Sequence, residues 1–274
     1  SLVEYRRGLV MNIIEINRKN LKLTQMILNF MGSIKYWGID CFKYRKITSK
    51  NQDLKNICQL NTCYILGNGP SLKNVDISLL QGKDVITVNK FIKTNLFEQV
   101  KPKYHVVIDK YILEEISEDI ERELQRTDSS TIFILHRSAI KRFQKYNRAR
   151  FVYGTKMASR TQAFCNDMTK NMTTFLNVLP FAVSCAMYIG YENIILLGND
   201  FSFFAARKDQ HFYDVEENKK RVESLYSDLA GCSIVLTEYR TLYEYAKRKG
   251  INVVNATEGS LLDEIPQVKL EDYI

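Results

Sequence analysis

The chain contains 274 residues, of which 45% are hydrophobic and 26% are charged. This is the composition of an ordinary globular protein, long enough for one large domain with an appendage, and it excludes a disordered or fibrous chain. No run of about 18 uncharged apolar residues occurs, so we expect no membrane-spanning helix. The six cysteines form no CxxC pair and have no histidine at metal-ligand spacing, which indicates reduced core thiols in a cytoplasmic protein and no metal site.

The formal net charge of +8 lies almost entirely in the first fifty residues, which carry ten Lys and Arg against three Asp and Glu. No recognised nucleic-acid motif accompanies this charge, so we expect no nucleic-acid partner. Residues 1–56 show helical spacing of apolar residues, with aromatic and basic side chains among them. Such a segment suits an anionic membrane surface, or else a helical appendage that packs on the main domain or on another copy of the chain. Both interpretations stay open.

The polar stretch 49–53 predicts a linker, so we divide the chain into a basic amphipathic helical segment, 1–56, and a main domain, 57–274. Short apolar runs and helical stretches alternate through the main domain, which predicts a mostly parallel α/β sheet with helices on both faces. The expected strands are 64–66, 84–88, 104–108, 131–135, 150–153, 193–197, 233–236 and 252–254. The expected helices are 113–125, 174–189 and 238–249, with a helix or tight crossover beginning at residue 72.

The turn after the first strand, Gly67-Asn68-Gly69-Pro70-Ser71, is the motif around which we expect the site to form. A Gly-rich turn ahead of a helix presents unpaired backbone N–H groups and the positive end of the helix dipole, and both favour an anion such as phosphate. The glycines allow a ligand to approach the backbone closely, and Asn68 and Ser71 add side-chain donors. An ordinary strand–turn–helix corner explains the same pattern equally well.

Polar residues follow five of the expected strands. Because ligands bind at the carboxyl ends of the strands in a parallel sheet, these exits together predict a polar ligand with hydroxyls, amides or phosphates. The exits are Gly67–Gly69, Asn89-Lys90, Asp109-Lys110, Gly198–Asp200 and Asn255–Gly259.

The three histidines are candidates for proton transfer. His211 follows the strand exit at Gly198–Asp200 on an expected loop, where a pKa near working pH suits a general base or acid. His105 lies inside an apolar strand and is expected to be a core residue, and His136 ends a strand near the rim. A solvated loop histidine remains the competing interpretation of His211. The motifs GxxxxGK[ST], HExxH and GxSxG are all missing from the sequence, so P-loop, zincin and α/β-hydrolase chemistry lack their usual signals.

Three stretches together resemble the successive motifs of bacterial CMP-sialic-acid-dependent sialyltransferases: Gly67–Leu72, Val88–Phe91 and Ile189–Phe201. The resemblance extends to a wider superfamily that includes motility-associated flagellin glycosyltransferases and 6-hydroxymethylpterin diphosphokinase-like proteins. It covers about residues 63–266 and implies a Rossmann-like fold of a GT-A-like variant. The first sixty residues have no counterpart in it.

The resemblance implies roles for individual residues of this sequence. Gly67, Asn68, Gly69 and Ser71 would lie by the phosphate and ribose of a cytidine nucleotide, Asn89 and Asp109 beside the sugar donor, and Asn177 and Asp200 along the donor site. Tyr213 would bond the leaving phosphate. The stretch that contains Asn255 and Thr257 resembles the wider superfamily more closely than the sialyltransferases. The histidine that serves the sialyltransferases as base has no counterpart at 233–237, so His211 would have to serve instead.

We therefore expect an inverting, metal-independent glycosyltransferase that moves an acidic sugar (a sialic acid, another nonulosonic acid or Kdo) from a CMP-activated donor to a surface glycan such as lipooligosaccharide or capsule. The expected location is the cytoplasm, with residues 1–56 available for contact with the inner face of the membrane. Two alternatives remain: a Mg²⁺-dependent pterin or nucleotide diphosphokinase, with the metal held by Asp109, Asp200 or both, and a non-catalytic binding or assembly subunit. The oligomeric state is left open.

Overall fold

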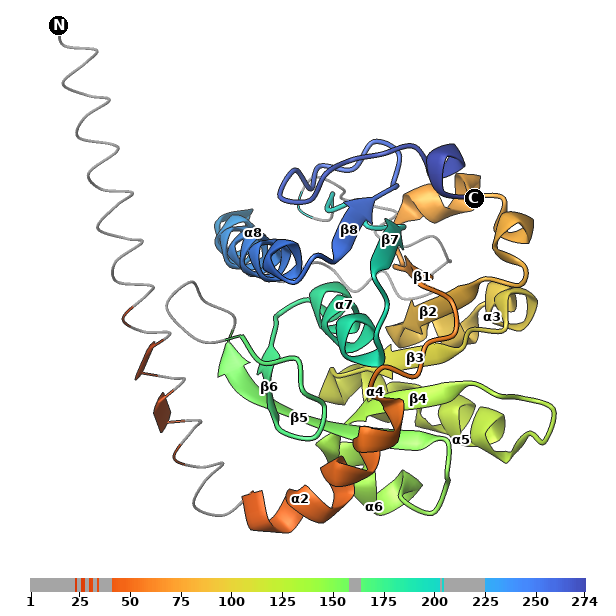
Figure 1. Ribbon diagram of the computed structural model, residues 1–274, viewed down its shortest axis with the longest axis vertical. Coiled ribbons are helices and arrows are strands. Elements are labelled where there is room, and N and C mark those ends of the chain that lie inside the picture. The colour runs from red at the N-terminus through yellow and green to blue at the C-terminus, as the bar shows by residue number, and fades with distance from the viewer. Residues whose placement is uncertain are drawn as a thin grey trace, which may run out of the picture.

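The computed structural model describes residues 41–157, 164–202, 204 and 225–274, together with six separate positions between Leu23 and Ile34. Eight strands form one sheet in the order β6-β5-β4-β3-β2-β1-β7-β8 (Figure 1). All seven pairings between neighbouring strands are parallel. The predicted parallel α/β sheet, Rossmann-like in its layers, is therefore confirmed.

The strands are β1 Thr62–Leu66, β2 Asp84–Val88, β3 Tyr104–Val107, β4 Ile132–His136, β5 Ala149–Met157, β6 Asn171–Thr174, β7 Asn193–Leu197 and β8 Asn252–Asn255. The helices are α2 Cys41–Thr48, α3 Asn95–Val100, α4 Lys110–Glu115, α5 Ser117–Gln125, α6 Ile140–Phe143, α7 Val178–Ile189 and α8 Leu225–Arg248. Short 3-10 helices are η2 Ser49–Leu54, η3 Pro70–Asn74, η4 Ile77–Leu80, η5 Asn89–Lys93, η6 Arg137–Ala139 and η7 Leu270–Tyr273.

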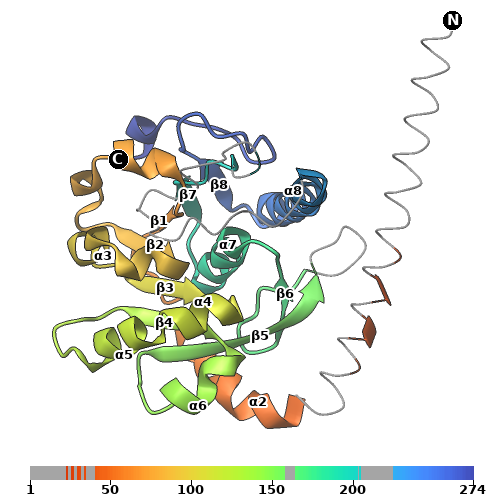
Figure 2. The ribbon, with the colours of Figure 1, turned by 180° about the vertical axis from the view of Figure 1, so that it is seen from behind.

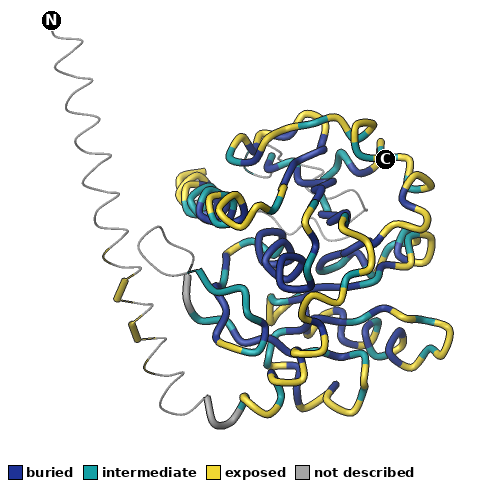
Figure 3. Tube along the Cα trace, in the orientation of Figure 1, coloured by how far each residue is buried: buried dark blue, intermediate teal, exposed yellow. Residues whose placement is uncertain are grey.

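Helices cover both faces of the sheet (Figures 1 and 2). One face packs against α7 and α8, through side chains such as Phe181 and Tyr239. The other face packs against α3, α4, α5 and α6, through side chains such as Phe97 and Ile120. Helix α7 is apolar all round and buried along its length, as expected for a helix enclosed between a sheet and a second helix (Figure 3).

The sheet changes direction at β1, which lies between β2 and β7. From β1 the chain adds β2 to β6 in sequence on one side, and then returns to add β7 and β8 on the other. In open α/β sheets this switch point leaves a crevice at the carboxyl ends of the two strands that flank it. The polar exits of β1, β2, β3 and β7 meet there.

One expected strand is wrong, and one strand of the structure was not expected. Residues 233–236 lie inside the long helix α8, since a short apolar run does not distinguish a strand from a buried helix turn. Strand β6 was missed, because its polar sequence Asn171–Thr174 lacks the usual apolar run. The segment after Ser71, expected to form a helix or a tight crossover, forms the short 3-10 helices η3 and η4.

The stretch predicted as a linker, 49–53, lies within η2 and packs on the sheet. Asn51 is fully buried, and its Nδ2 donates to the carbonyl oxygens of Phe151 and Met168, each at 2.8 Å. The hydroxyl of Thr48 donates to the carbonyl of Thr169 at 3.0 Å. Residues 41–54 are thus bound to the main domain by buried hydrogen bonds, whereas the arrangement of residues 1–40 lies largely outside the described part of the chain.

Of the described cysteines, five are free thiols: Cys58, Cys63, Cys165, Cys185 and Cys232. Within the described ranges, no helix combines the length and the apolar character needed to cross a membrane.

Candidate functional site

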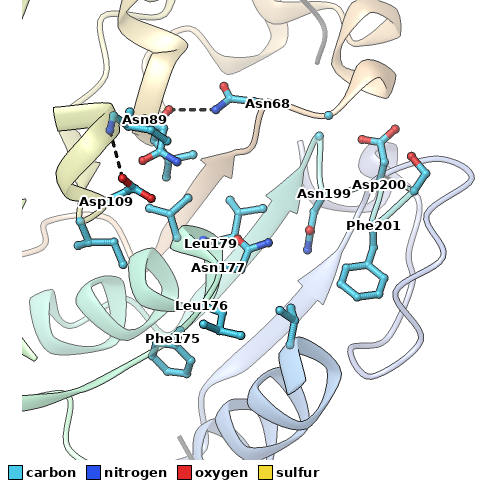
Figure 4. A pocket seen from close by; sticks show the side chains of 18 of the residues that line it. Asn68, Asn89, Asp109, Phe175, Leu176, Asn177, Leu179, Asn199, Asp200 and Phe201 are labelled. Carbon is cyan, nitrogen blue, oxygen red and sulfur yellow. Dashed lines mark hydrogen bonds between the residues drawn. The ribbon is translucent and has the colours of Figure 1, made fainter. Parts of the chain in front are cut away.

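A pocket of about 540 Å³ opens at the switch point, at the carboxyl ends of β1, β2, β3 and β7 (Figure 4). One wall is polar and is formed by Asn68, Asn89, Asp109, Asn199 and Asp200. The apolar part of the lining comes from Phe175, Leu176, Val178, Leu179, Phe201 and Val235. The pocket therefore suits a ligand with one hydrogen-bonding side and one apolar side.

Gly67 and Gly69 allow β1 and β7 to end side by side. A Cβ on Gly67 would lie 2.3 Å from the carbonyl oxygen of Gly198, and a Cβ on Gly69 would lie 1.8 Å from Oδ2 of Asp200. Gly69 has ordinary extended backbone angles, so close approach of the neighbouring chain, and not a left-handed conformation, requires the glycine here. Gly69 lines the pocket, whereas Gly67 lies just beneath it.

The anion expected at the Gly-rich turn is supplied by the protein itself. The carboxylate of Asp200 accepts the backbone N–H of Ser71 at 3.0 Å and the Ser71 hydroxyl at 2.8 Å. Ser71 consequently points at Asp200, and the two donors of Ser71 that were predicted for a phosphate are already used. The turn closes β1 onto β7 and leaves Asn68 and Gly69 to face the ligand.

Two amides extend the polar wall. Asn68 donates from Nδ2 to the carbonyl oxygen of Val88 at 3.3 Å, which leaves its buried Oδ1 without a partner among the described residues. Asn89 has a left-handed φ of 51°, and its Oδ1 is likewise buried and unpartnered. Asp109 begins α4, where its Oδ1 accepts the N–H groups of Tyr111 at 2.7 Å and Ile112 at 3.1 Å. Two unpartnered hydrogen-bond acceptors thus lie within this part of the lining.

Asn177 joins the apolar wall to α7. Its Oδ1 accepts the N–H of Leu179 at 2.9 Å, so the predicted site residue caps the first turn of the helix and also lines the pocket. Asn255 and Thr257 lie in a layer behind the pocket. Thr257 Oγ1 accepts the backbone N–H of Asn199 at 3.0 Å, and Asn255 Nδ2 donates to Ser260 Oγ at 2.9 Å. Contact of these two residues with a ligand stays a prediction.

The histidines that the structure describes do not line the pocket. His105 is fully buried between Phe97 and Phe133, with Nδ1 2.8 Å from the Thr87 hydroxyl, and burial lowers its pKa to about 3. His136 accepts the N–H of Ser138 through Nδ1, and burial, followed by the charge of Arg137, lowers its pKa to about 4. His211 and Tyr213, the predicted base and phosphate partner, lie outside the described residues.

Comparison with known proteins adds two findings. Residues 41–205 match the model of the family described as 6-hydroxymethylpterin diphosphokinase MptE-like. The chain belongs to this MptE-like family. It is also similar to the probable 3-deoxy-manno-octulosonic acid transferase of Escherichia coli (strain K12), with 25% identity over 241 residues, which cover 75% of this chain and 81% of that protein. No solved structure matches.

These similarities support the wider glycosyltransferase-like superfamily predicted for the MptE-like chain, and with it a transferase. They do not extend to a CMP-sialic-acid-dependent sialyltransferase in particular. The predicted donor, acceptor and site roles therefore depend on the geometry of the pocket and on experiment.

Two contacts of the MptE-like site, one to Asn199 and one made by Glu238, were not predicted because both involve α8. Asn199 is buried in the pocket wall, and its Oδ1 accepts the hydroxyl of Tyr239 at 3.2 Å. Glu238, the residue before Tyr239, is fully buried and accepts the backbone N–H of Leu176 at 3.0 Å. Burial raises the pKa of Glu238 to about 8, against the lowering effect of the Leu176 and Asn177 N–H groups. A helical period through residues 233–239 would have extended the expected helix 238–249 toward its true start, but the two contacts themselves join residues that meet only after folding.

The charges around the pocket are acidic. Among the described residues that line it, Asp109 and Asp200 are the charged ones, and Lys, Arg and His do not occur. No group of three or more His, Cys, Asp or Glu in the described ranges has the arrangement of a metal site.

Proposed function

We propose that this MptE-like protein is a glycosyltransferase that moves an acidic sugar, of the 3-deoxy-manno-octulosonic acid or sialic acid class, from a CMP-activated donor to a hydroxyl of a surface glycan. The observation that carries the proposal is the pocket at the switch point, with its two unpartnered amide oxygens and its largely apolar remaining lining. Acceptor oxygens suit the hydroxyls and the exocyclic amine of a cytidine nucleotide. The similarity to a probable 3-deoxy-manno-octulosonic acid transferase supports the class of sugar.

The proposed roles follow the walls of the pocket. The nucleotide would lie against Asn68, Gly69 and Asn89, and the sugar between Asp109 and Asn177. A base, for which His211 remains our candidate, would take the proton of the acceptor hydroxyl as its oxygen bonds the anomeric carbon. The bond from that carbon to the phosphate oxygen breaks on the opposite side, so CMP leaves and the configuration inverts. Tyr213 would donate to the leaving phosphate.

A Mg²⁺-dependent pterin or nucleotide diphosphokinase is the second candidate, and one observation favours it. The charged residues among the described pocket lining are the carboxylates of Asp109 and Asp200, and oxygen ligands of this kind can hold a divalent cation beside a polyphosphate. The carboxylate oxygens fit Mg²⁺, which prefers oxygen ligands and would neutralise charge on the transferred group. The family description agrees with this candidate.

Thermal unfolding with added nucleotides separates the two candidates. CMP, CDP, UDP, GDP and ATP are each added with Mg²⁺ and with chelator. A ligand that binds only the folded state, at about a hundred times its Kd, stabilises by roughly 2.7 kcal/mol, which raises the midpoint by several degrees. We expect a shift with CMP that is equal in Mg²⁺ and in chelator. Asn89→Ala should abolish this shift, whereas Asn252→Ala, an exposed amide at the start of β8, should retain it.

Other results of the thermal unfolding experiment favour other functions. A shift with ATP that requires Mg²⁺ replaces the glycosyltransferase with the diphosphokinase. If no nucleotide shifts the midpoint, the transferase is rejected in favour of a binding or assembly subunit. Release of CMP from a CMP-activated acidic sugar, lost in His211→Ala, then tests the base.

A further inference from the structure

Asn199 carries an unexplained polar group in the pocket wall. Its side chain is 3% exposed, its backbone N–H donates to Thr257 Oγ1 at 3.0 Å, and its carbonyl accepts the Ser260 hydroxyl at 2.7 Å. Its Oδ1 accepts the hydroxyl of Tyr239 at 3.2 Å. Its Nδ2 has no hydrogen-bond partner among the described residues. A buried amide nitrogen of this kind loses its hydrogen bonds to water without replacement, so the arrangement calls for a partner from outside the protein.

The direction of the Asn199 amide is set from α8. Tyr239 is fully buried, and burial raises the pKa of its phenol, which therefore keeps its proton and donates it. Donation to Oδ1 fixes which end of the amide faces Tyr239, so the NH₂ group is the end that does not. In Figure 4 the Asn199 side chain points into the pocket, on the wall next to Phe201 and Asp200. Thr257 and Ser260 hold the backbone on the other side, so little freedom remains for the side chain to turn.

The surroundings of Nδ2 indicate what it binds. An amide NH₂ is a donor, so the ligand atom is an acceptor. The pocket also contains the start of α7, where Asn177 and Val178 form the first turn and where the helix dipole favours negative charge. Asp200, the carboxylate nearest in sequence, is occupied by Ser71. The ligand atom is therefore an oxygen that carries full or partial negative charge.

We propose that Asn199 is a specificity-determining residue that donates from Nδ2 to a carboxylate or phosphoryl oxygen of the substrate, and that Tyr239 is the positioning residue that aims this donation. The proposal extends the proposed function, since a CMP-activated acidic sugar carries both kinds of oxygen. The shared chemistry is an oxyanion, and the test distinguishes the two sources.

Isothermal titration of two probes, CMP and the free acidic sugar Kdo, is the test. Asn199→Asp keeps the shape of the side chain but replaces both N–H donors with an oxygen, and Tyr239→Phe removes the aiming hydroxyl alone. Tyr188→Phe is the matched control, because Tyr188 is also a buried tyrosine and its hydroxyl donates to the Asn51 carbonyl at 3.1 Å, away from the pocket. Thermal midpoints of the unliganded variants report folding separately.

We expect Asn199→Asp to raise the Kd of the probe that carries the contacted oxygen by at least about tenfold. The substitution replaces a hydrogen-bond donor with a negative charge that repels this oxygen. A loss for CMP identifies the phosphoryl oxygen, and a loss for Kdo identifies the carboxylate. Tyr239→Phe should raise the Kd of the same probe by about threefold. Tyr188→Phe should lower the midpoint of thermal unfolding and leave both Kd values unchanged. If Asn199→Asp does not fold, the Kd values of Tyr239→Phe and Tyr188→Phe are compared instead, and they decide whether Asn199 binds the substrate.

Unchanged Kd values in Asn199→Asp would overturn the proposal, as would equal effects of Tyr239→Phe and Tyr188→Phe. ATP with Mg²⁺ is the third probe and separates this proposal from the proposed function. If wild-type protein binds ATP with Mg²⁺ and neither CMP nor Kdo, the glycosyltransferase is rejected and the same variants decide the role of Asn199 on ATP. If wild-type protein binds none of the three, both proposals are rejected.

Discussion

The carboxylate of Asp200 and the turn at Gly69 and Ser71 form a single unit at the centre of the site. The carboxylate accepts two hydrogen bonds from Ser71 and fills the space beside the Gly69 Cα. A sequence motif that attracts phosphate in other proteins is used here to join β1 to β7. The position of both pocket walls depends on this contact, so its disruption should affect binding as well as stability.

Gly69→Ala is the residue-scale prediction. The new Cβ would lie 1.8 Å from Asp200 Oδ2 and 2.6 Å from the Gly198 carbonyl oxygen, and the second atom is backbone that cannot rotate away. We expect a loss of about 1–3 kcal/mol in the free energy of unfolding by urea, together with loss of the nucleotide-induced thermal shift. Gly231→Ala is the control, because Gly231 lies inside α8 with no atom within 4 Å of its Cβ position, and there alanine should stabilise by about 0.5–1 kcal/mol. Equal stability of Gly69→Ala and wild type would contradict the steric argument.

At the scale of the element, six apolar side chains near the N-terminus form one face of a helix. Leu23, Met26, Ile27, Phe30, Met31 and Ile34 recur at helical spacing and are 48–67% exposed. A stripe of this size in a basic region of the chain suits the surface of an anionic bilayer, where apolar side chains enter the headgroup region and positive charge is attracted. We therefore retain contact with a membrane surface as a proposal.

Cosedimentation with vesicles tests the stripe. We expect binding to vesicles that contain phosphatidylglycerol, weaker binding to phosphatidylcholine alone, and release at high salt. Phe30→Asp should abolish binding, whereas Leu79→Asp, which replaces an exposed leucine of the main domain, should not. Equal sedimentation with and without anionic vesicles would remove the membrane from the proposal and leave another protein surface as the partner of the stripe.

At the scale of the whole molecule, two fully buried groups make stability depend on pH in opposite directions. The pKa of Glu238 is raised from 4.5 to about 8, so between these values the folded protein keeps a proton that the unfolded chain has lost, and stability falls as the pH rises. The pKa of His105 is lowered from 6.5 to about 3, so in that range the unfolded chain binds a proton that the folded protein does not, and stability falls as the pH falls. Between pH 4.5 and 6.5 the two effects cancel.

We predict that the contribution of Glu238 and His105 to the free energy of unfolding is constant from about pH 4.5 to 6.5. It should decline below and above this range. From pH 6.5 to 8 the loss from Glu238 is about 2 kcal/mol, because each pKa unit corresponds to about 1.4 kcal/mol. Urea unfolding of wild type and Glu238→Gln at both pH values measures it, and the variant should lose this decline. Glu258→Gln, on an exposed loop, should retain it. A decline of the same size in Glu238→Gln would assign it to another group.

Sequence patterns predicted the sheet well, because buried parallel strands such as β7 are largely apolar runs between polar turns. They misread residues 233–236, where four residues are too few to separate a strand from a buried helix turn. The strand-exit rule located the pocket, since Asn68, Asn89 and Asp109 all line it. It could not reveal that Ser71 is bound by Asp200 or that Tyr239 aims Asn199, because each contact joins residues that are adjacent only after folding.

The position of β1 also affects how the chain is made. The strand pairs on one side with β2, which follows it closely, and on the other with β7, where Thr62 meets Asn193. At roughly 5–20 residues per second, the second edge of β1 waits on the order of ten seconds for its partner on the ribosome. Throughout that time the unpaired backbone N–H and C=O groups along this edge of a largely apolar strand are open to strands of other nascent chains. Yield in a cell should therefore depend on how fast residues 67–192 are translated and on chaperones that cover this edge.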